Sequence, residues 1–390
     1  MIKKTYINPY LTSAFSWLSV LILYNLGWSN LYPPISIELL AFFIINILAC
    51  GFIGFYLSYK GYITYKKIEY NLNKIKKLSI IYILANIAEI IYSRKIPIIA
   101  IINGELDNSD FGIPIIHPLI ITFGIFLGLY IFHMIISNDT KKRIILLPYF
   151  ILSFIGVTII FGRGLMFMTF LGCCLIYIMS TSFNKKILLP LTLLGIFILY
   201  LFGLAGNIRI GETGVRITTI GQATEKFENS YIPSEFFWSY IYFSSPIANL
   251  EYNLQTDKIH NIDKETLKKL YISEIIPQFI SNKIIPDNQT VEPNLITKAL
   301  NVCSVYTRCY SIAGWTGIII MLIYIFFYIF TILLIIPIKS QYFIVTITIL
   351  NMLMVGNVFD NMMNYLLSYT IFYPIFFTIK EKIKFIISNE

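Results

Sequence analysis

The sequence predicts an all-α polytopic membrane protein with about ten transmembrane helices and one large loop between the seventh and eighth spans. Of its 390 residues, 57% are hydrophobic and only 13% are charged, whereas soluble domains are about one quarter charged. The apolar residues form runs of the length that a bilayer core requires, which is roughly 20 residues in a helix. Helices are expected because a bilayer offers the backbone no hydrogen-bond partners. This composition excludes a soluble, disordered or fibrous protein.

Ten apolar runs define the predicted spans. In order, the spans are residues 10–28, 35–59, 78–102, 115–137, 144–161, 164–182, 187–206, 311–336, 342–359 and 365–379. No small-residue cleavage site follows Lys3 and Lys4, so we expect the first run to remain as a span. Pro97 predicts a break or a re-entrant segment within the third run. The last two runs are short and contain Asn351 and Pro374.

The connections between spans alternate in charge. If the N-terminus is cytoplasmic, every short connection on that side carries Lys or Arg, whereas the opposite turns 29–34 and 360–364 carry neither. The positive-inside rule then places both termini in the cytoplasm. The same rule accounts for the net charge of +9, so no nucleic-acid partner is expected.

The long connection divides the chain into three parts: spans one to seven (1–206), the loop (207–310), and spans eight to ten with the C-terminus (311–390). The loop is nearly neutral, with ten Lys and Arg against eleven Asp and Glu. Its aromatic segment 233–254 predicts a helix with Ser234 as N-cap. Segment 263–283 predicts an amphipathic helix, either on the membrane surface or packed on the bundle.

Arginine is distributed differently from lysine. The chain has six arginines, and only Arg143 falls on the predicted cytoplasmic side. The other five fall outside: Arg94, Arg163, Arg209, Arg216 and Arg308. The planar fork of guanidinium donors fits phosphate bidentately. We therefore expect these arginines to hold an anionic group such as a lipid-linked phosphate or diphosphate; the alternative is binding of structural lipid headgroups or snorkelling.

Three positions in this set are the most informative. Arg163 lies in a tight turn between the fifth and sixth spans. Arg209 and Arg216 follow the seventh span in a glycine-rich segment, where glycines would let the backbone approach a ligand. A helix through this segment would place both arginines on one face. Arg308 closes the far end of the same loop, and the phosphate-binding pattern GxxxxGK[ST] is absent from the chain.

Few other side chains indicate chemistry. Glu89 lies inside the third span, where a carboxylate suggests a functional site, although an ion pair with Arg94 or Lys95 is the favoured reading. No group of residues has metal-ligand spacing and no DxD motif is present, so we expect neither metal nor cofactor. Attack by a hydroxyl would need a base near the outer face. The candidates are His260, Glu251, Asp287, Glu292 and His117.

Two cysteines, Cys303 and Cys309, fall on the outer side. An oxidising compartment would permit a disulfide between them, but a helical stretch would keep the two thiols apart. Both alternatives remain open from the sequence.

Several short stretches, together with the span number and the outer loop, carry a resemblance to a known family. The stretches are residues 96–120, FGRGLMF at 161–167, GLAGNIRIG at 203–211, YFSSPIANLEYN at 242–253 and the aromatic start of the eighth span. The chain resembles the bacterial O-antigen polymerases, which are oligosaccharide repeat-unit polymerases of the Wzy type. The resemblance runs over most of the chain.

The resemblance implies a GT-C-like glycosyltransferase of the bacterial inner membrane with a periplasmic loop. Such an enzyme transfers the growing glycan from undecaprenyl pyrophosphate to the non-reducing end of the next lipid-linked unit, without a metal. Expected partners are the lipid-linked donor and acceptor, membrane lipids and a chain-length regulator protein. The predicted catalytic residues are Arg209, Arg216 and His260, of which Arg209 matches the family as a pyrophosphate ligand. The predicted substrate-binding residues are Arg163, Arg308, Arg94, His117 and Glu89.

Two other functions stay open. An O-antigen ligase has similar spans and a periplasmic loop but transfers glycan to lipid A–core. A flippase or transporter of lipid-linked oligosaccharides would predict two related halves, which the sequence does not display. A channel or structural protein would not explain the arginine distribution.

Overall fold

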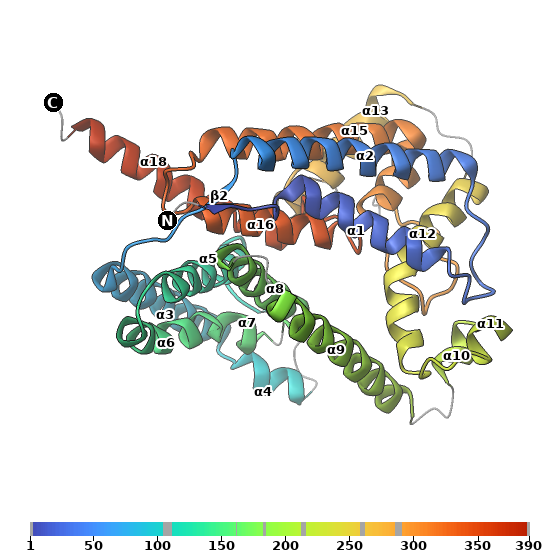
Figure 1. Cartoon of the computed structure of the whole chain (residues 1–390), viewed down its shortest axis with the longest axis horizontal. Helices are drawn as coiled ribbons and strands as arrows, with labels where there is room; N and C mark the ends of the chain where they lie inside the picture. Colours follow the sequence, from blue (N-terminus) through green and yellow to red (C-terminus); the bar gives the residue numbers. More distant parts are fainter. Residues whose placement is uncertain are drawn as a thin grey trace.

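The fold was obtained as a computed structural model, which describes residues 3–103, 111–160, 162–181, 185–211, 216–257, 262–284 and 291–387. Helices make up most of this described chain (Figure 1). A short antiparallel ladder pairs β1 (Lys3–Lys4) with β2 (Thr64–Tyr65) and ties the N-terminus to the connection after the second helix. The prediction of an all-α membrane protein is therefore confirmed at the level of fold class.

The first two helices form an antiparallel pair. Asn8 caps α1 (Pro9–Tyr24), and Ser36 caps α2 (Ile37–Lys60), because side-chain oxygens satisfy the free N–H groups of a first turn. The amide of Asn8 also donates to the carbonyl of Gly54 at 3.0 Å. This bond joins the start of α1 to the second half of α2.

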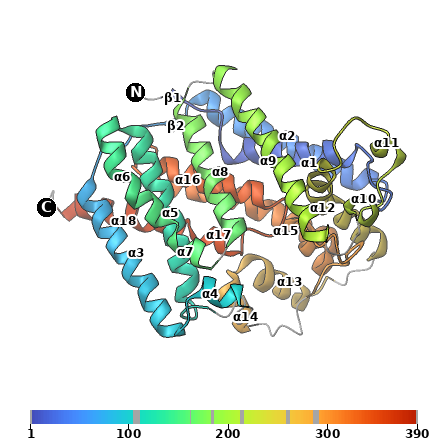
Figure 2. The same cartoon turned by 90° about the horizontal axis from the view of Figure 1, so that it is seen from below.

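The next helices occupy the middle of the chain. They are α3 (Leu72–Ser93), α4 (Pro97–Ile102), α5 (Ile116–Ser137), α6 (Thr140–Ser153), α7 (Ile155–Ile159), α8 (Arg163–Ser180) and α9 (Lys185–Gly211). The predicted break at Pro97 is confirmed, because α3 ends before this proline and α4 begins with it. Figure 2 shows α9 running toward α12, against which it packs.

The remaining elements form the long loop and the C-terminal helices. They are α10 (Ile217–Ile220), α11 (Glu225–Glu228), α12 (Phe236–Thr256), α13 (Lys264–Leu270), the π-helix η2 (Tyr271–Ile275), α14 (Gln278–Ile284), α15 (Val305–Ile335), α16 (Phe343–Gly356), α17 (Leu366–Tyr369) and α18 (Phe372–Ile387). The predicted helix in 233–254 is confirmed as α12, but its N-cap is Glu235 rather than Ser234. The predicted single helix in 263–283 is wrong, since α13, η2 and α14 divide this segment.

Within the described residues, five helices are long and apolar enough to cross a membrane: α2, α5, the consecutive pair α6 and α7, α8 and α15. The other predicted spans overlap α1, α3, α9, α16 and the pair α17 and α18. Of these, α1, α16 and the described part of α9, Thr192–Ile208, are apolar but shorter than 18 residues. Large apolar side chains such as Phe15 and Phe52 are more than two-thirds exposed. Such surfaces suit contact with lipid, so the protein is membrane-embedded.

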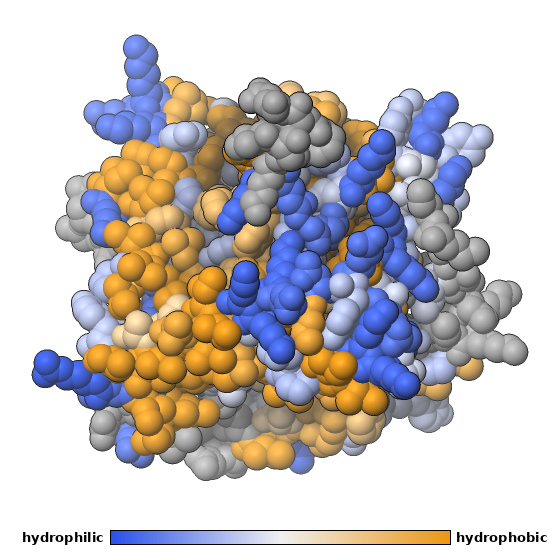
Figure 3. Space-filling view, turned by 90° about the vertical axis from the view of Figure 1, so that its left-hand side faces the viewer, coloured by the Kyte–Doolittle hydropathy of each residue, from blue (hydrophilic) through white to orange (hydrophobic). Residues whose placement is uncertain are grey.

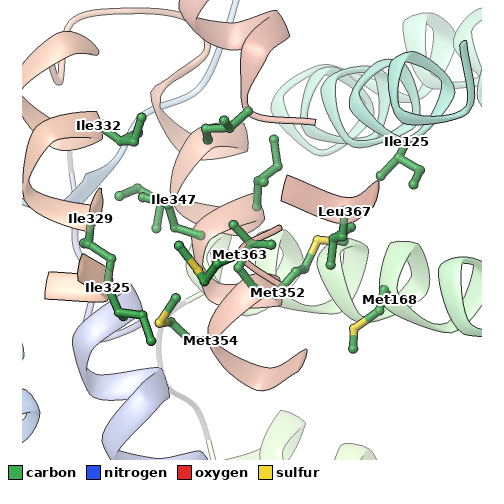
Figure 4. Close-up of a cluster of buried hydrophobic side chains, with 14 of the residues drawn as sticks. Ile125, Met168, Ile325, Ile329, Ile332, Ile347, Met352, Met354, Met363 and Leu367 are labelled. Atoms are coloured by element: carbon green, nitrogen blue, oxygen red, sulfur yellow. The ribbon is translucent and has the colours of Figure 1, made fainter. Parts of the chain in front are cut away.

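Helix α16 is the centre of the core. Every residue of α16 except Val355 is buried, as expected for a helix that is apolar all round. Figure 4 shows Ile347 of α16 near Ile329 of α15, with Met168 of α8 and Ile125 of α5 on the other side. α16 also contacts α1, so it joins the group of α1, α2 and α15 to the group of α3, α5, α6 and α8.

The connections gather at two opposite ends of the bundle. We call the first the lysine end, made of residues 3–4, 60–77, 137–143, 336–342 and the last turns of α18. Here Lys74 pairs with Glu381 at 3.5 Å, and Tyr130 donates to Gln341 at 2.5 Å. Figure 3 shows hydrophilic side chains gathered on this face. Exposed lysines of this end include Lys66, Lys67, Lys76, Lys77, Lys141 and Lys339.

The second, the loop end, is made of residues 25–36, 357–365 and the described part of 216–310. The backbone of Asn30 donates to Gln222 at 2.8 Å, beside an isolated bridge between Ser29 and Ala223. The backbone of Gln278 donates to Asn364 at 2.9 Å. The long loop therefore folds back onto both short turns that the sequence predicts outside the membrane.

Candidate functional site

The start of α15 is separated from the rest of that helix. Ser304 caps it in a reciprocal arrangement with Thr307, and the helical backbone is interrupted at Ala313 and Gly314. Gly314 has φ 56° and ψ −145°, a conformation that side chains with a Cβ rarely adopt. A Cβ on Gly317 would collide with the carbonyl group of Cys309. The break leaves residues 305–312 as a short helix that belongs to the loop end.

A cavity of about 490 Å³ opens beside this short helix at the loop end. Its walls come from η2, α14, α15 and the two loop segments around 292 and 360–365. The lining side chains are Ser273, Glu274, Gln278, Ser281, Asn282, Val291, Glu292, Arg308, Ile312, Asp360, Asn361, Asn364 and Tyr365. Most of them are polar, and they include one arginine and three carboxylates.

Arg308 and Asp360 form an ion pair across this cavity. The distance from Nε of Arg308 to Oδ1 of Asp360 is 3.2 Å, and both side chains are little more than one-third exposed. Asp360 also accepts a hydrogen bond from the backbone of Asn361 at 2.8 Å. Among the described residues, Nε of Arg308 makes an ion pair but no hydrogen bond. This buried nitrogen therefore faces Asp360.

Glu274 is the most deeply buried charge of the cavity, with 4% of its surface exposed. Nδ2 of Asn361 donates to its Oε2 at 2.8 Å and to its backbone carbonyl at 2.9 Å. Burial raises the pKa of Glu274, although the hydrogen bond from Asn361 and the charge of Arg308 both oppose this shift. A carboxyl group whose pKa is raised in this way is better able to take up a proton near neutral pH.

Amide side chains hold the cavity wall in place. Nδ2 of Asn364 donates to the carbonyl of Ser273 at 2.5 Å, and Tyr369 donates to the carbonyl of Asn364 at 2.7 Å. Together with Asn361 on Glu274, these bonds fix the turn 360–364 against η2. Sequence reasoning missed this wall; its only signal was the polar composition of a short outer turn, DNMMN.

Glu89 and His117 form a separate buried pair outside the cavity lining. Nδ1 of His117 lies 3.0 Å from both carboxylate oxygens of Glu89, which is 1% exposed, and Ile113 donates its N–H to Oε1 at 3.3 Å. A Cβ on Gly112, whose φ is 100°, would press on the His117 ring. The expected partner of Glu89 was Arg94 or Lys95, and the structure shows His117 in that position. The sequence did not predict the contact between Glu89 and His117, because the two residues lie in different helices.

The predicted arginines lie on separate elements. Arg94 is the C-cap of α3 with φ 52°, and Arg163 begins α8. Arg209 lies in the last turn of α9, whereas Arg216 is the exposed N-cap of α10. The expectation of one helical face for the last two is therefore wrong. Of the predicted site residues, Arg308 lines the cavity; the side chain of Arg209 lies outside the described residues.

The glycines before Arg209 have a packing role instead of the expected ligand role. A Cβ on Gly203 would collide with the carbonyl of Glu235, and one on Gly206 would press on the Trp238 ring. Nε1 of Trp238 donates to the side chain of Asn207 at 2.7 Å. These glycines let α9 approach α12 closely, as small residues do between membrane helices.

The other base and cysteine candidates fall in four groups. His260 and Asp287 lie outside the described residues. Glu251 is fully buried and accepts hydrogen bonds from the backbone N–H and hydroxyl of Ser36 at 3.0 and 2.9 Å, so it anchors α12 to the start of α2. Cys303 and Cys309 are both free thiols. Glu292 alone among these candidates lines the cavity.

No protein-family model matches the chain, and no curated protein or solved structure matches it. The site must therefore be interpreted from its own geometry.

Proposed function

We propose that the protein is a membrane glycosyltransferase that polymerises undecaprenyl-pyrophosphate-linked O-antigen repeat units at the periplasmic face of the bacterial inner membrane. The observation that carries the proposal is the cavity at the loop end, where Arg308 meets three carboxylates and several amides. A cation and carboxylates side by side suit a reaction that expels an anion while a hydroxyl loses its proton.

The reaction follows from these groups. A hydroxyl of the acceptor sugar attacks the anomeric carbon of the donor glycan, and the bond from that carbon to the diphosphate oxygen breaks. The hydroxyl proton passes to a carboxylate, for which Glu274, Glu292 and Asp360 are the candidates. The lipid diphosphate leaves with the bonding electrons, and fixed guanidinium groups stabilise the charge that develops on it.

The single positive charge of Arg308 is not enough to neutralise a diphosphate. The cavity lining holds one arginine against three carboxylates, so a diphosphate needs further cations nearby. The resemblance supplies Arg209 and Arg216 for this role. We therefore assign the diphosphate to Arg209 and Arg216, with Arg308 on the side that faces the acceptor.

The proposal includes an orientation. The exposed lysines of the lysine end favour the cytoplasmic side for that end, by the positive-inside rule. Both termini are then cytoplasmic, the loop end is periplasmic and ten spans of a GT-C-like bundle cross the membrane. The remaining proposed partners are membrane lipids and a chain-length regulator.

The test is the lipopolysaccharide banding pattern of a deletion strain of the bacterium that carries this chain. A ladder reduced to core plus one repeat unit supports the polymerase. Naked core would instead indicate a ligase, and lipid-linked units retained on the cytoplasmic side would indicate a flippase. Either of these two results would overturn the proposal.

A further inference from the structure

We infer that the cavity binds the acceptor end of the glycan and selects neutral or amino-bearing sugars over sugars that carry a carboxylate. The inference rests on the proposed function, because it takes the ligand to be a glycan. It adds a selectivity for charge, which follows from the charges and amides that line the cavity.

The size and lining of the cavity suit sugar rings. Its volume of about 490 Å³ falls within the range of about 300–1,000 Å³ that is typical of small-molecule sites. Gln278, Asn282 and Glu292 line it with planar groups, each of which presents two polar atoms at once. Such groups match pairs of neighbouring hydroxyls. Tyr365 adds an aromatic ring, whose apolar face can pack against the C–H groups of a sugar.

The charge balance gives the selectivity. Arg308 is committed to Asp360 at 3.2 Å, so the two charges largely offset each other. Glu274 and Glu292 remain, and the described lining residues include no second cation. If Glu274 is protonated, Glu292 still leaves the cavity with one negative charge. Because Glu292 is exposed, a carboxylate on the sugar would be repelled by this charge across a site open to solvent, and low salt leaves that repulsion largely unscreened.

The experiment compares three glycosides that differ in one group. Purified full-length protein in nanodiscs of zwitterionic lipid is titrated at low salt with methyl glucoside, methyl 2-amino-2-deoxyglucoside and methyl glucuronide, and binding is read by saturation-transfer NMR. We expect the neutral and amino glycosides to bind and the glucuronide to bind about tenfold more weakly, the effect of one like charge at an effective dielectric between protein and water. Added salt should narrow this gap.

Three variants locate the effect. Glu292→Gln should narrow the gap between glucoside and glucuronide, because it removes a cavity charge. Glu265→Gln is the matched control, since Glu265 is exposed on α13 and outside the cavity lining; it should leave the gap unchanged. Tyr365→Ala should weaken all three glycosides together.

Equal or tighter binding of the glucuronide would overturn the inference, and so would the absence of binding by all three glycosides to protein of normal thermal stability. An unchanged gap in Glu292→Gln would also overturn it. Failure of the proposed function is distinguishable, because it appears in the banding pattern of the deletion strain and not in this binding measurement.

Discussion

The two ends of the bundle hold their charges in opposite ways. At the lysine end, Lys74 lies over the rings of Tyr130 and Tyr342, 5.4 and 4.7 Å from their centroids, and pairs with Glu381. This cation is enclosed by the protein's own groups. At the loop end, Arg308 pairs with Asp360, and both line a cavity together with Glu274 and Glu292. The difference separates a charge that packs against aromatic rings of the protein from charges that border a cavity.

Among the residues that line the cavity, the largest effect is expected at Arg308. Arg308→Gln should reduce chain extension by about 100-fold, the scale of misplacing a reactant, because Arg308 holds Asp360 on the acceptor side of the cavity. Arg308→Lys should also fail, because an ammonium lacks the planar fork. The assay is the lipopolysaccharide ladder with protein level checked by immunoblot.

The matched control for this change is at the lysine end. Arg143 is exposed and donates from Nε to the carbonyl of Asn138 at 2.7 Å. Arg143→Gln should leave the ladder intact. An equal loss of chain extension in Arg308→Gln and Arg143→Gln would contradict the proposed difference between the two ends.

Variants of Arg209 test the diphosphate-binding role that the family resemblance implies. Arg209→Ala should abolish chain extension at near-normal protein level, and Arg209→Lys should fail as well, since bidentate contact with a diphosphate needs a guanidinium. The same ladder measures both variants. Full activity of the two would remove Arg209 from the mechanism and leave the diphosphate without an assigned ligand.

The break in α15 should matter for stability. Gly314→Ala imposes a Cβ on a backbone conformation reserved for glycine, which costs about 1–3 kcal/mol in free energy of unfolding. Thermal unfolding in detergent should show a lowered midpoint. Gly195→Ala on α9 is the control, because a Cβ there meets nothing within 4 Å. A midpoint equal to that of the control would mean that the interruption of α15 is not required.

Glu274 makes the loop end sensitive to pH. Burial raises the pKa of Glu274 in the folded protein above the ordinary value of 4.5. The folded state therefore favours the protonated carboxyl group. This stabilisation is fully present below pH 4.5 and is lost as the pH rises through the folded pKa. Glu274→Gln removes this loss. The melting temperature of the variant should therefore gain on that of the wild type between pH 4 and pH 8. A constant difference over this range would show that the burial of Glu274 carries no such penalty.

The smallest effect is expected at Lys74. Lys74→Met removes one cation–π arrangement and one partly exposed ion pair, each worth about 0.5–1 kcal/mol at such sites. We expect a slightly lower melting temperature and an unchanged ladder. Loss of polymer at normal protein level would place chemistry at the lysine end and contradict the comparison.

The sequence predicted the helices well because each depends on a local apolar run. The break at Pro97 and the aromatic helix α12 were both visible in this way. The break at Gly314 was not predicted, since an isolated glycine in an apolar run is a weak signal. The predicted eighth span begins at Ser311, close to the true interruption, because the apolar run itself begins there.

The site was less predictable, because it depends on contacts between distant segments. Arg308 was selected from its predicted side of the membrane, but its partner Asp360 lies 52 residues later in a turn that showed no motif. Glu89 likewise pairs with His117 rather than with a neighbouring cation. The sequence shows which charged residues lie in apolar segments, whereas the tertiary fold determines which of these residues come into contact.

The interruption of α15 also defines where this protein can be divided for engineering. The helical backbone is interrupted at Ala313 and Gly314, so residues 305–312, with Arg308 among them, are covalently continuous with the long part of α15 but structurally part of the loop end. A chimera that exchanges the outer segment for that of a relative should therefore place its junction at Gly314. A junction at Ser311, where the apolar run begins, would split the short capped helix.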